Sequence, residues 1–478
     1  MSDLTTTFRV FFPSSSFRAS GLAAALAFFV CLIAAPSASA LTYTVTTNAD
    51  SGAGSLRQAV LDANGTAAAD VIVFNIPPVS CPAGVCTITL ASEIIITNNG
   101  SLSINGTGAN VLTIDGGAGT NRIFFSDAAI FNLSGVTLTS GNGTGGSFNG
   151  SGGALIVVNG TTTISGVYFN ANSASEGGGI LFLLGANHRV ENSTFSGNTV
   201  TINGGGIQVT SANLTVVNTT LSGNSASSVG GGINASGSGT LTLRGDTITA
   251  NTASQGGGVS RGGTGTLDFG NTIIAGNTAT TSFPEINFAS GTVTSSGFNL
   301  VGDSAGDASA TGTAITYQST DIQNTPPLLD TLANYGGTTP TRRLQTGSPA
   351  IDKGNSFGLT TDQRGFTRPF DNPGITNATG GDGSDIGAFE FEAVAMFVGG
   401  RILTTSGRAV RNAFVTLTNQ TTGETRFALT NPFGYYRFAN VPTGQTYVFA
   451  VRHKRYTFTS QAVIINGERS DLNFTASP

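Results

Sequence analysis

The sequence predicts an all-β protein in which a right-handed parallel β-helix is followed by a small β-sandwich. The main body repeats about every 26 residues, in short β-branched pieces separated by Gly and Asn, and the last part of the chain loses this repeat. Glycine supplies 67 of 478 residues, and charged side chains only 10%. The low charge argues against a disordered chain, and glycine-punctuated β-branched runs are typical of an all-β repeat.

Residues 1–40 have the features of a secretory signal peptide. Arg9 and Arg18 precede an apolar run at 21–35, and the small residues Ala38-Ser39-Ala40 follow it. A positive start, a short apolar stretch and an A-x-A ending mark such a leader. The run is too short for a comfortable membrane span. We therefore expect export, cleavage before Leu41 and no transmembrane span in the mature chain.

The mature chain then keeps two cysteines, Cys81 and Cys86, on either side of a Pro/Gly turn. In an oxidising compartment we expect this pair to form a local disulfide. A redox or zinc motif would need a different spacing and, for zinc, more ligands.

Asparagine marks the clearest repeat. Intervals of 26, 26, 27 and 26 residues separate Asn172, Asn198, Asn224, Asn251 and Asn277. A glycine triplet and a β-branched residue follow each of the first four, at 177–180, 204–207, 230–233 and 256–259. Glycine at such a corner permits positive φ and close backbone approach.

Apolar residues keep the same register, at three and eight residues before each asparagine. A unit this short cannot bury an apolar face alone, but stacked units form a continuous core. No helical period runs through the units. We therefore expect each unit to be one coil of three short strands. The asparagines should stack as a ladder that exchanges side-chain amide hydrogen bonds.

The open N-terminal end of a β-helix needs a cap, because it exposes unpaired strand edges. Ser55 as N-cap and Gln58 at position N3 fit a capping box. An apolar stripe follows, at Leu56, Ala59, Val60 and Ala63. We expect an amphipathic helix that plugs the core, within a region of cap and irregular coils at 41–130. The regular repeats then occupy 131–300.

Two parts of the body resemble exported bacterial β-helix proteins. The stretch Asn48–Asn64 resembles the segment that contains the CSLREA-type motif, with Gly54 in place of its cysteine. Ser348–Asp352, Asp362–Arg368 and Asp385–Glu390 are similar to the motifs of the choice-of-anchor Q domain. This resemblance implies that residues 301–393 end and cap the β-helix ahead of an accessory domain.

The tail, residues 395–478, consists of alternating strand pieces between turns, which predicts a small sandwich. Nearly all of it resembles the carboxypeptidase regulatory-like domain. The resemblance implies a transthyretin- or immunoglobulin-like β-sandwich without peptidase chemistry.

Charge divides unevenly between body and tail. The tail has nine basic and three acidic side chains, whereas residues 41–394 have 10 and 22. Arg452, His453, Lys454 and Arg455 form a basic run, which either binds anionic glycans, lipid headgroups or an acidic partner, or is a solvated loop. Four of the eight tyrosines also lie in the tail, so stacking on sugars is expected there rather than on the coils.

The charged residues of the coils do not indicate an active site. Glycoside hydrolysis needs two carboxyl groups that face one cleft. The acids between 131 and 300 take different positions in the repeat: Glu176, Glu191, Asp246, Asp268 and Glu285. His188 replaces a packing leucine, and Arg244 alternates with Asp246 as in an exposed ion pair. We therefore expect no catalytic residue, no cofactor and no metal ligand.

The densest charged set comprises Asp362, Arg364, Arg368, Asp385 and Glu390. We interpret it as an ion-pair network that holds the terminal cap, because these residues belong to the motifs of the resemblance. Calcium binding through Asp382 and Asp385 is the alternative.

These observations predict a secreted or cell-surface structural and adhesive protein, with polysaccharides or other surface components as partners and no nucleic acid. The alternative is a carbohydrate-active enzyme, a polysaccharide lyase or glycoside hydrolase, with an unrecognised groove site.

Overall fold

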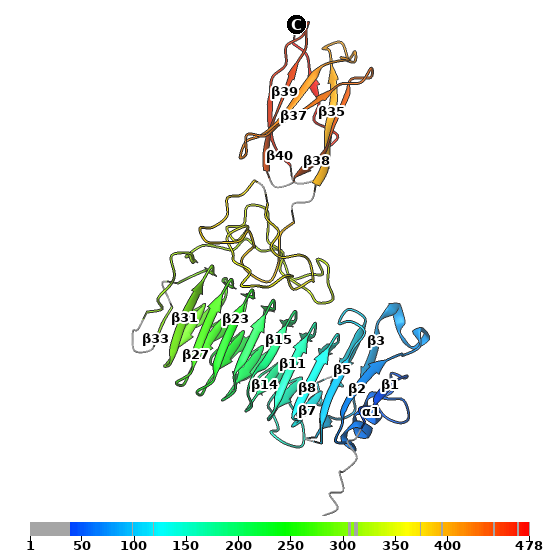
Figure 1. Ribbon diagram of the computed structural model, residues 1–478, viewed down its shortest axis with the longest axis vertical. Helices are drawn as coiled ribbons and strands as arrows, with labels where there is room; N and C mark the ends of the chain where they lie inside the picture. Colours follow the sequence, from blue (N-terminus) through cyan, green and yellow to red (C-terminus); the bar gives the residue numbers. More distant parts are fainter. Residues whose placement is uncertain are drawn as a thin grey trace, which may run out of the picture. The chain divides into compact units, whose positions relative to one another are not determined.

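The computed structural model describes residues 39–477, apart from 98, 118, 305–306, 310–313, 373, 393–394, 443–444 and 466–467. The predicted signal peptide lies outside the described residues except for its last two. The described chain has the expected fold class, a parallel β-solenoid followed by a small antiparallel sandwich (Figure 1). No helix in the described part is long and apolar enough to cross a membrane.

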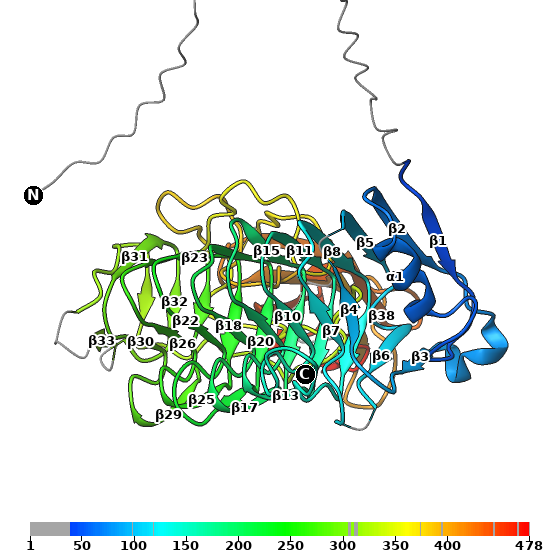
Figure 2. The ribbon, with the colours of Figure 1, turned by 90° about the horizontal axis from the view of Figure 1, so that it is seen from below.

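Three long parallel sheets run along the solenoid, and each coil adds one strand to each sheet (Figures 1 and 2). The first sheet contains β1 (Thr42–Val45), β2 (Ala69–Phe74), β5 (Ser101–Asn105), β8 (Ile130–Ser134), β11 (Thr161–Ser165), β15 (His188–Glu191), β19 (Leu214–Val217), β23 (Thr240–Arg244), β27 (Thr266–Gly270) and β31 (Thr292–Gly297). The second contains β4 (Ile94–Ile96), β7 (Phe124–Ser126), β10 (Leu155–Val157), β14 (Ile180–Phe182), β18 (Ile207–Val209), β22 (Ile233–Ala235), β26 (Val259–Arg261), β30 (Ile286–Phe288) and β33 (Ala308–Ser309). The third contains β3 (Cys86–Thr89), β6 (Leu112–Asp115), β9 (Thr137–Thr139), β12 (Tyr168–Asn170), β16 (Thr194–Ser196), β20 (Thr220–Ser222), β24 (Thr247–Thr249), β28 (Ile273–Ile274), β32 (Leu300–Val301) and β34 (Ile322–Gln323).

The expectation of three strands per coil is wrong for the regular coils, which have a fourth short strand just before the glycine triplet. This fourth sheet contains β13 (Ser173–Glu176), β17 (Thr199–Asn203), β21 (Ser225–Ala226), β25 (Thr252–Gln255) and β29 (Thr278–Ser282). These strands carry mostly Ser, Thr and Ala, so they lack the apolar signal of the other three. Their inward residues form a small cluster of their own: Val200, Ala226 and Ala253.

Inward side chains of the long sheets stack into one continuous core. Phe169 and Phe195, from neighbouring coils, lie parallel with ring centroids 4.5 Å apart. The apolar residues at three and eight positions before each repeat asparagine are all fully buried, which confirms the register.

The glycine triplets turn the corner before the second sheet. Only the first glycine of each has a positive φ, as at Gly204 (70°). The second is required by close approach, because a Cβ at Gly205 would lie 2.3 Å from the carbonyl oxygen of Gly231 in the next coil.

The N-terminal helix α1 (Leu56–Asn64) buries the predicted apolar stripe. The Ser55 hydroxyl accepts a hydrogen bond from the Gln58 backbone N–H at 3.2 Å, as an N-cap does. The Gln58 side chain instead donates to Asp62 at 2.7 Å, so only half of the predicted capping box forms.

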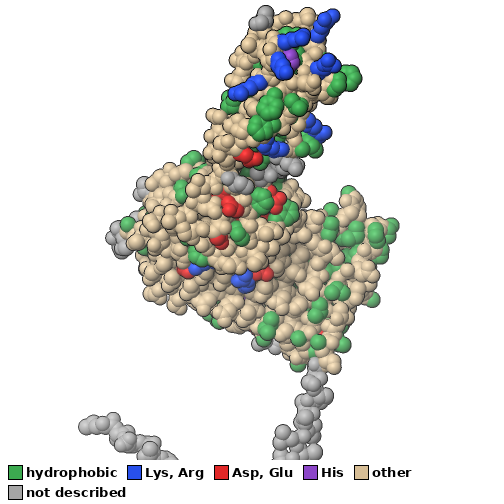
Figure 3. Space-filling model, turned by 45° about the horizontal axis from the view of Figure 1, so that its top comes forward, with side chains coloured by type: hydrophobic (Ala, Val, Ile, Leu, Met, Phe, Trp, Pro, Cys, Tyr) green, Lys and Arg blue, Asp and Glu red, His purple; other side chains and the backbone are tan. Residues whose placement is uncertain are grey.

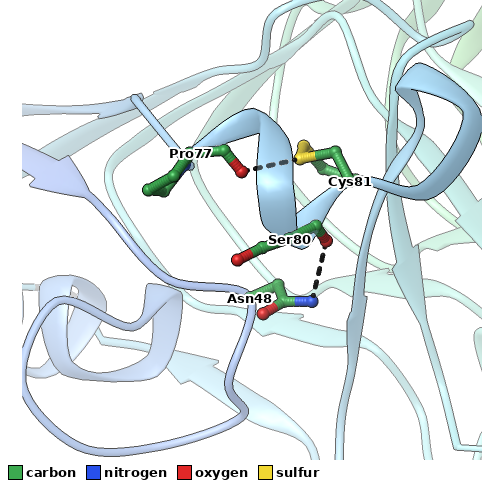
Figure 4. Close-up of a disulfide and its surroundings, with 5 residues drawn as sticks. Asn48, Pro77, Ser80 and Cys81 are labelled. Atoms are coloured by element: carbon green, nitrogen blue, oxygen red, sulfur yellow. Dashed lines mark hydrogen bonds between the residues drawn. A yellow bond between two sulfur atoms is a disulfide. The ribbon is translucent and has the colours of Figure 1, made fainter.

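A disulfide joins Cys81 and Cys86 beside two short 3-10 helices, η1 (Pro78–Ser80) and η2 (Pro82–Gly84) (Figure 4). The Asn48 side chain donates to the carbonyl oxygen of Ser80 at 3.3 Å and so ties the segment before α1 to this turn.

The segment 301–393, predicted to end and cap the β-helix, has two parts: β33 and β34 are the last strands of their sheets, whereas residues 325–392 form mostly irregular structure that lies beside the coils. Side chains of this second part bond to the outer face of the third sheet: Gln363 donates to Thr194 on β16 at 2.8 Å and accepts from Thr220 on β20 at 2.6 Å. Residues 325–392 therefore lie alongside the coils as a lateral cover (Figures 1 and 2). At the C-terminal end of the solenoid, Ile315 and Tyr317 pack against the core instead.

The tail is a sandwich of two sheets with a separate core. One contains β38 (Tyr435–Pro442), β35 (Ala395–Leu403) and β41 (Phe474–Thr475). The other contains β37 (Thr425–Leu429), β36 (Phe414–Asn419), β39 (Gln445–Arg452) and β40 (Gln461–Ile465).

Candidate binding site

The repeat asparagines form a buried ladder. Each Nδ2 donates to the Oδ1 of the next asparagine, at 3.0, 2.8, 2.9 and 2.9 Å along the series. The same Oδ1 also accepts the backbone N–H of the preceding asparagine, as from Asn198 to Asn224 at 3.1 Å. The side-chain amides of these asparagines are therefore hydrogen-bonded inside the fold and do not form a binding surface.

Glu285 ends this ladder, which the sequence did not indicate. It accepts from Asn277 Nδ2 at 2.7 Å and from the Gly276 N–H at 2.9 Å. Burial raises the pKa of Glu285 to about 8. Glu285 occupies the position that the third glycine of the triplet has in the other coils. This departure from the repeat is the sequence feature from which the end of the ladder could have been predicted.

A second buried ladder runs through Ser193, Thr219, Asp246, Thr272 and Asn299 and ends at Asp321. The interpretation of Asp246 as an exposed partner of Arg244 is wrong. The Asp246 carboxylate is fully buried and accepts from the backbone N–H groups of Thr219 (2.8 Å) and Arg244 (2.9 Å). The Arg244 guanidinium pairs with Asp268 at 2.5 Å instead.

These buried carboxyl groups predict a stability that falls as pH rises. Burial raises the pKa of Asp246 from 3.8 to about 8 and that of Glu285 from 4.5 to about 8. The folded state holds these protons more tightly than the unfolded state, so the stabilisation is complete below about pH 4 and is lost as pH rises to about 8. The melting temperature of the full chain should therefore decrease between pH 5 and pH 9.

Asp246→Thr tests this cause, because threonine fills the same position in the coils on either side. At pH 9 the variant should melt about 5 °C or more above the parent, with a shallower pH dependence. Asp268→Asn, which removes a partly exposed carboxylate that pairs with Arg244, should not raise the melting temperature at pH 9. Parallel melting curves for parent and Asp246→Thr would rule out this origin of the pH effect.

The remaining acids of the regular coils have local partners. Glu191 pairs with Arg189 at 2.5 Å, and Glu176 accepts from Asn203 at 3.2 Å.

His188 is buried, stacks on Phe182 with centroids 4.6 Å apart and bonds to the Leu184 carbonyl oxygen. Burial lowers the His188 pKa.

The five charged residues of the lateral cover come together as two ion pairs and a third carboxylate, Asp385, whose backbone N–H donates to Glu390 Oε1 at 3.2 Å. Arg364 pairs with Asp362 at 2.6 Å, and Arg368 Nε with Glu390 at 2.7 Å. Asp385 accepts from the backbone N–H groups of Asp352 (2.8 Å) and Phe391, and burial raises its pKa.

The carboxylates considered for calcium are engaged by backbone donors. Asp382 accepts from the N–H groups of Ser356 (2.9 Å) and Ser384 (3.1 Å), and Asp385 has the bonds given above. Within the described residues, no group of three or more His, Cys, Asp or Glu side chains is arranged to hold a metal ion.

The tail domain contains an open cleft of about 900 Å³ that is lined by cations. It brings the predicted basic run together with a second segment that the sequence did not link to it. The lining residues are Ala409, Val410, Arg411, Asn412, Phe414, Arg452, His453, Lys454, Arg455 and Tyr456. Figure 3 shows Lys and Arg side chains gathered around a histidine on this domain.

Strand pairing builds the cleft. β36 and β39 are antiparallel, with Phe414 opposite Arg452, so the loop before β36 meets the loop after β39. The His453 ring stacks on Tyr456 with centroids 5.2 Å apart, and the Arg455 N–H donates to His453 Nδ1 at 3.2 Å. A cleft with several cations and aromatic rings is suited to hold an anion.

No curated protein matches the chain. Residues 398–477 match the carboxypeptidase regulatory-like domain, and the tail sandwich is a domain of this family.

Proposed function

We propose that the chain is a secreted or cell-surface structural and adhesive protein, in which the solenoid is a scaffold and the tail domain binds a glycan or another surface component. The observation that carries this proposal is the cation-lined cleft of the tail. The coils, by contrast, use their buried amides and acids to hold the stack together.

Export is supported by three features of the chain. Residues 1–40 have the pattern of a signal peptide. The disulfide between Cys81 and Cys86 suits an oxidising compartment. The CSLREA-like and choice-of-anchor Q-like segments resemble those of exported β-helix proteins.

A non-catalytic role is supported by the contacts of four acidic side chains in the coils, which are either buried in the ladders or paired with arginines. Asp246 and Glu285 are buried ladder members, while Glu191 and Asp268 pair with arginines. A pair of carboxyl groups facing one cleft, which glycoside hydrolysis requires, is not formed by these four residues.

The proposal is tested by measuring retention of the full chain on a panel of immobilised neutral and acidic polysaccharides. Saturable retention on at least one polymer, without loss of that polymer from the support, is expected. Failure to be retained on any of them, or steady release of soluble sugar, would overturn the adhesive function.

A further inference from the structure

The cations of the tail converge at one end of the sandwich. Arg411 precedes β36, and Arg452 ends β39. His453, Lys454 and Arg455 follow at once and turn into the same cleft.

The acids of the tail lie elsewhere. Glu424 is in the hairpin between β36 and β37, at the opposite end of these strands from Phe414. Asp471 pairs with Arg469 at 2.6 Å. No Asp or Glu side chain lines the cleft among the described residues.

The cleft cations are available to a ligand. Arg411, Arg452, Lys454 and Arg455 are exposed. The ion pairs of the described tail residues do not include these four side chains. Like charges crowded in one recess concentrate a positive potential there, which attracts anions over some distance.

We propose that this cleft binds an acidic polysaccharide that has a carboxylate on each sugar ring. Arginine recognises a carboxylate with two parallel hydrogen bonds, and several arginines along one cleft suit repeated carboxylates. The exposed Phe414 supplies a ring surface against which a sugar face can pack.

The shape of the site favours a polymer strand over a membrane. The cations line a recess of about 900 Å³, whereas a bilayer presents a nearly flat surface that is contacted by protruding groups. An acidic polysaccharide is one ligand class for the proposed adhesive function, and its assignment to this cleft rests on that function.

The test is a titration of the full chain with polygalacturonate, with methyl-esterified polygalacturonate as the matched ligand that has the same backbone without the charge. Binding to the acidic polymer and not to the ester is expected, and it should weaken steeply with added salt. In Lys454→Ala/Arg455→Ala, affinity should fall about 10-fold or more, because the charge-assisted hydrogen bonds of two cations to the polymer carboxylates are lost.

A control variant removes two cations of the same domain outside the cleft, the exposed Arg437 and the partly exposed Arg469, as Arg437→Ala/Arg469→Ala. It lowers the net charge equally and should keep its affinity within about 2-fold, as expected for charges that act only at long range. Equal weakening in both variants would overturn the site, because net charge alone would then explain the binding.

Vesicles of phosphatidylcholine with phosphatidylglycerol form the second arm of the test. Binding to these vesicles but not to polygalacturonate would replace the inference by a lipid headgroup site. If the chain is retained by other polysaccharides of the panel while polygalacturonate does not bind, the adhesive function stands and the inference falls.

Discussion

Replacing Asn224 by alanine is expected to lower the free energy of unfolding by about 3 kcal/mol or more. Asn224 is buried in the middle of the ladder, where its Oδ1 accepts from both the backbone N–H and the Nδ2 of Asn198. Its Nδ2 donates to Asn251 and to the Phe195 carbonyl oxygen. Alanine removes these four hydrogen bonds and leaves the buried Asn198 backbone N–H without its acceptor, and a buried group left in this way costs about 1–3 kcal/mol.

The measurement is the urea midpoint of the full chain, followed by a β-sheet signal. Asn213→Ala is the matched control, since the exposed Asn213 makes one such contact, to the Thr240 N–H at 2.8 Å. The control should lose less than about 1 kcal/mol. Similar midpoints for the two variants would contradict the structural role of the ladder.

Arg368→Ala is expected to cost about 3–5 kcal/mol, as is usual when one partner of a buried ion pair is removed. Both side chains of the Arg368–Glu390 pair are fully buried. Arg368 also donates to Asn218 of the solenoid at 3.1 Å and to the Gly387 carbonyl oxygen at 2.7 Å. Alanine therefore leaves the Glu390 carboxylate without its cation and removes a hydrogen bond between the lateral cover and the coils.

Limited proteolysis reports on this contact. Cleavage within 325–392 should be faster in Arg368→Ala than in the parent. Arg368→Met/Glu390→Leu, which removes both charges, should recover much of the lost stability. The exposed pair is the control: Arg343→Ala, which frees Asp330, should cost less than about 1 kcal/mol. If Arg368→Ala resists protease as well as Arg343→Ala, the cover does not depend on the buried pair.

The repeat allowed much of the fold to be predicted, because stacking forces equivalent positions to share an environment. The core register and the α1 stripe follow from periodicity alone. The fourth sheet was missed because its strands are polar and short. Asp246 was misjudged because alternation along one strand suggested exposure, whereas its neighbours in space are Thr219 and Thr272 of adjacent coils.

The position of the lateral cover was missed for a different reason. Nothing repeats in 325–392, and its contacts to Thr194 and Thr220 span more than 140 residues of sequence. One signal was present: Ile273 and Leu300 occupy outward positions that carry threonine in earlier coils. These apolar residues pack against Ile351 and Phe389 of the cover.

The sequence predicts one of the two segments that form the candidate site. The basic run at 452–455 is visible in the sequence, but Arg411 and Phe414 join it only through the pairing of β36 with β39. Strand pairing of this kind is set by the sandwich as a whole, so no local pattern could reveal it.

The most direct test of the central claim is to follow a polysaccharide that the full chain retains, through a day of incubation with an equimolar amount of protein. Polymer length and the absorbance of unsaturated sugar ends are measured on the same samples. Bound protein with unchanged polymer length and no new ends is the result expected for an adhesive protein. Shortened chains or rising absorbance would contradict the claim and establish a carbohydrate-active enzyme.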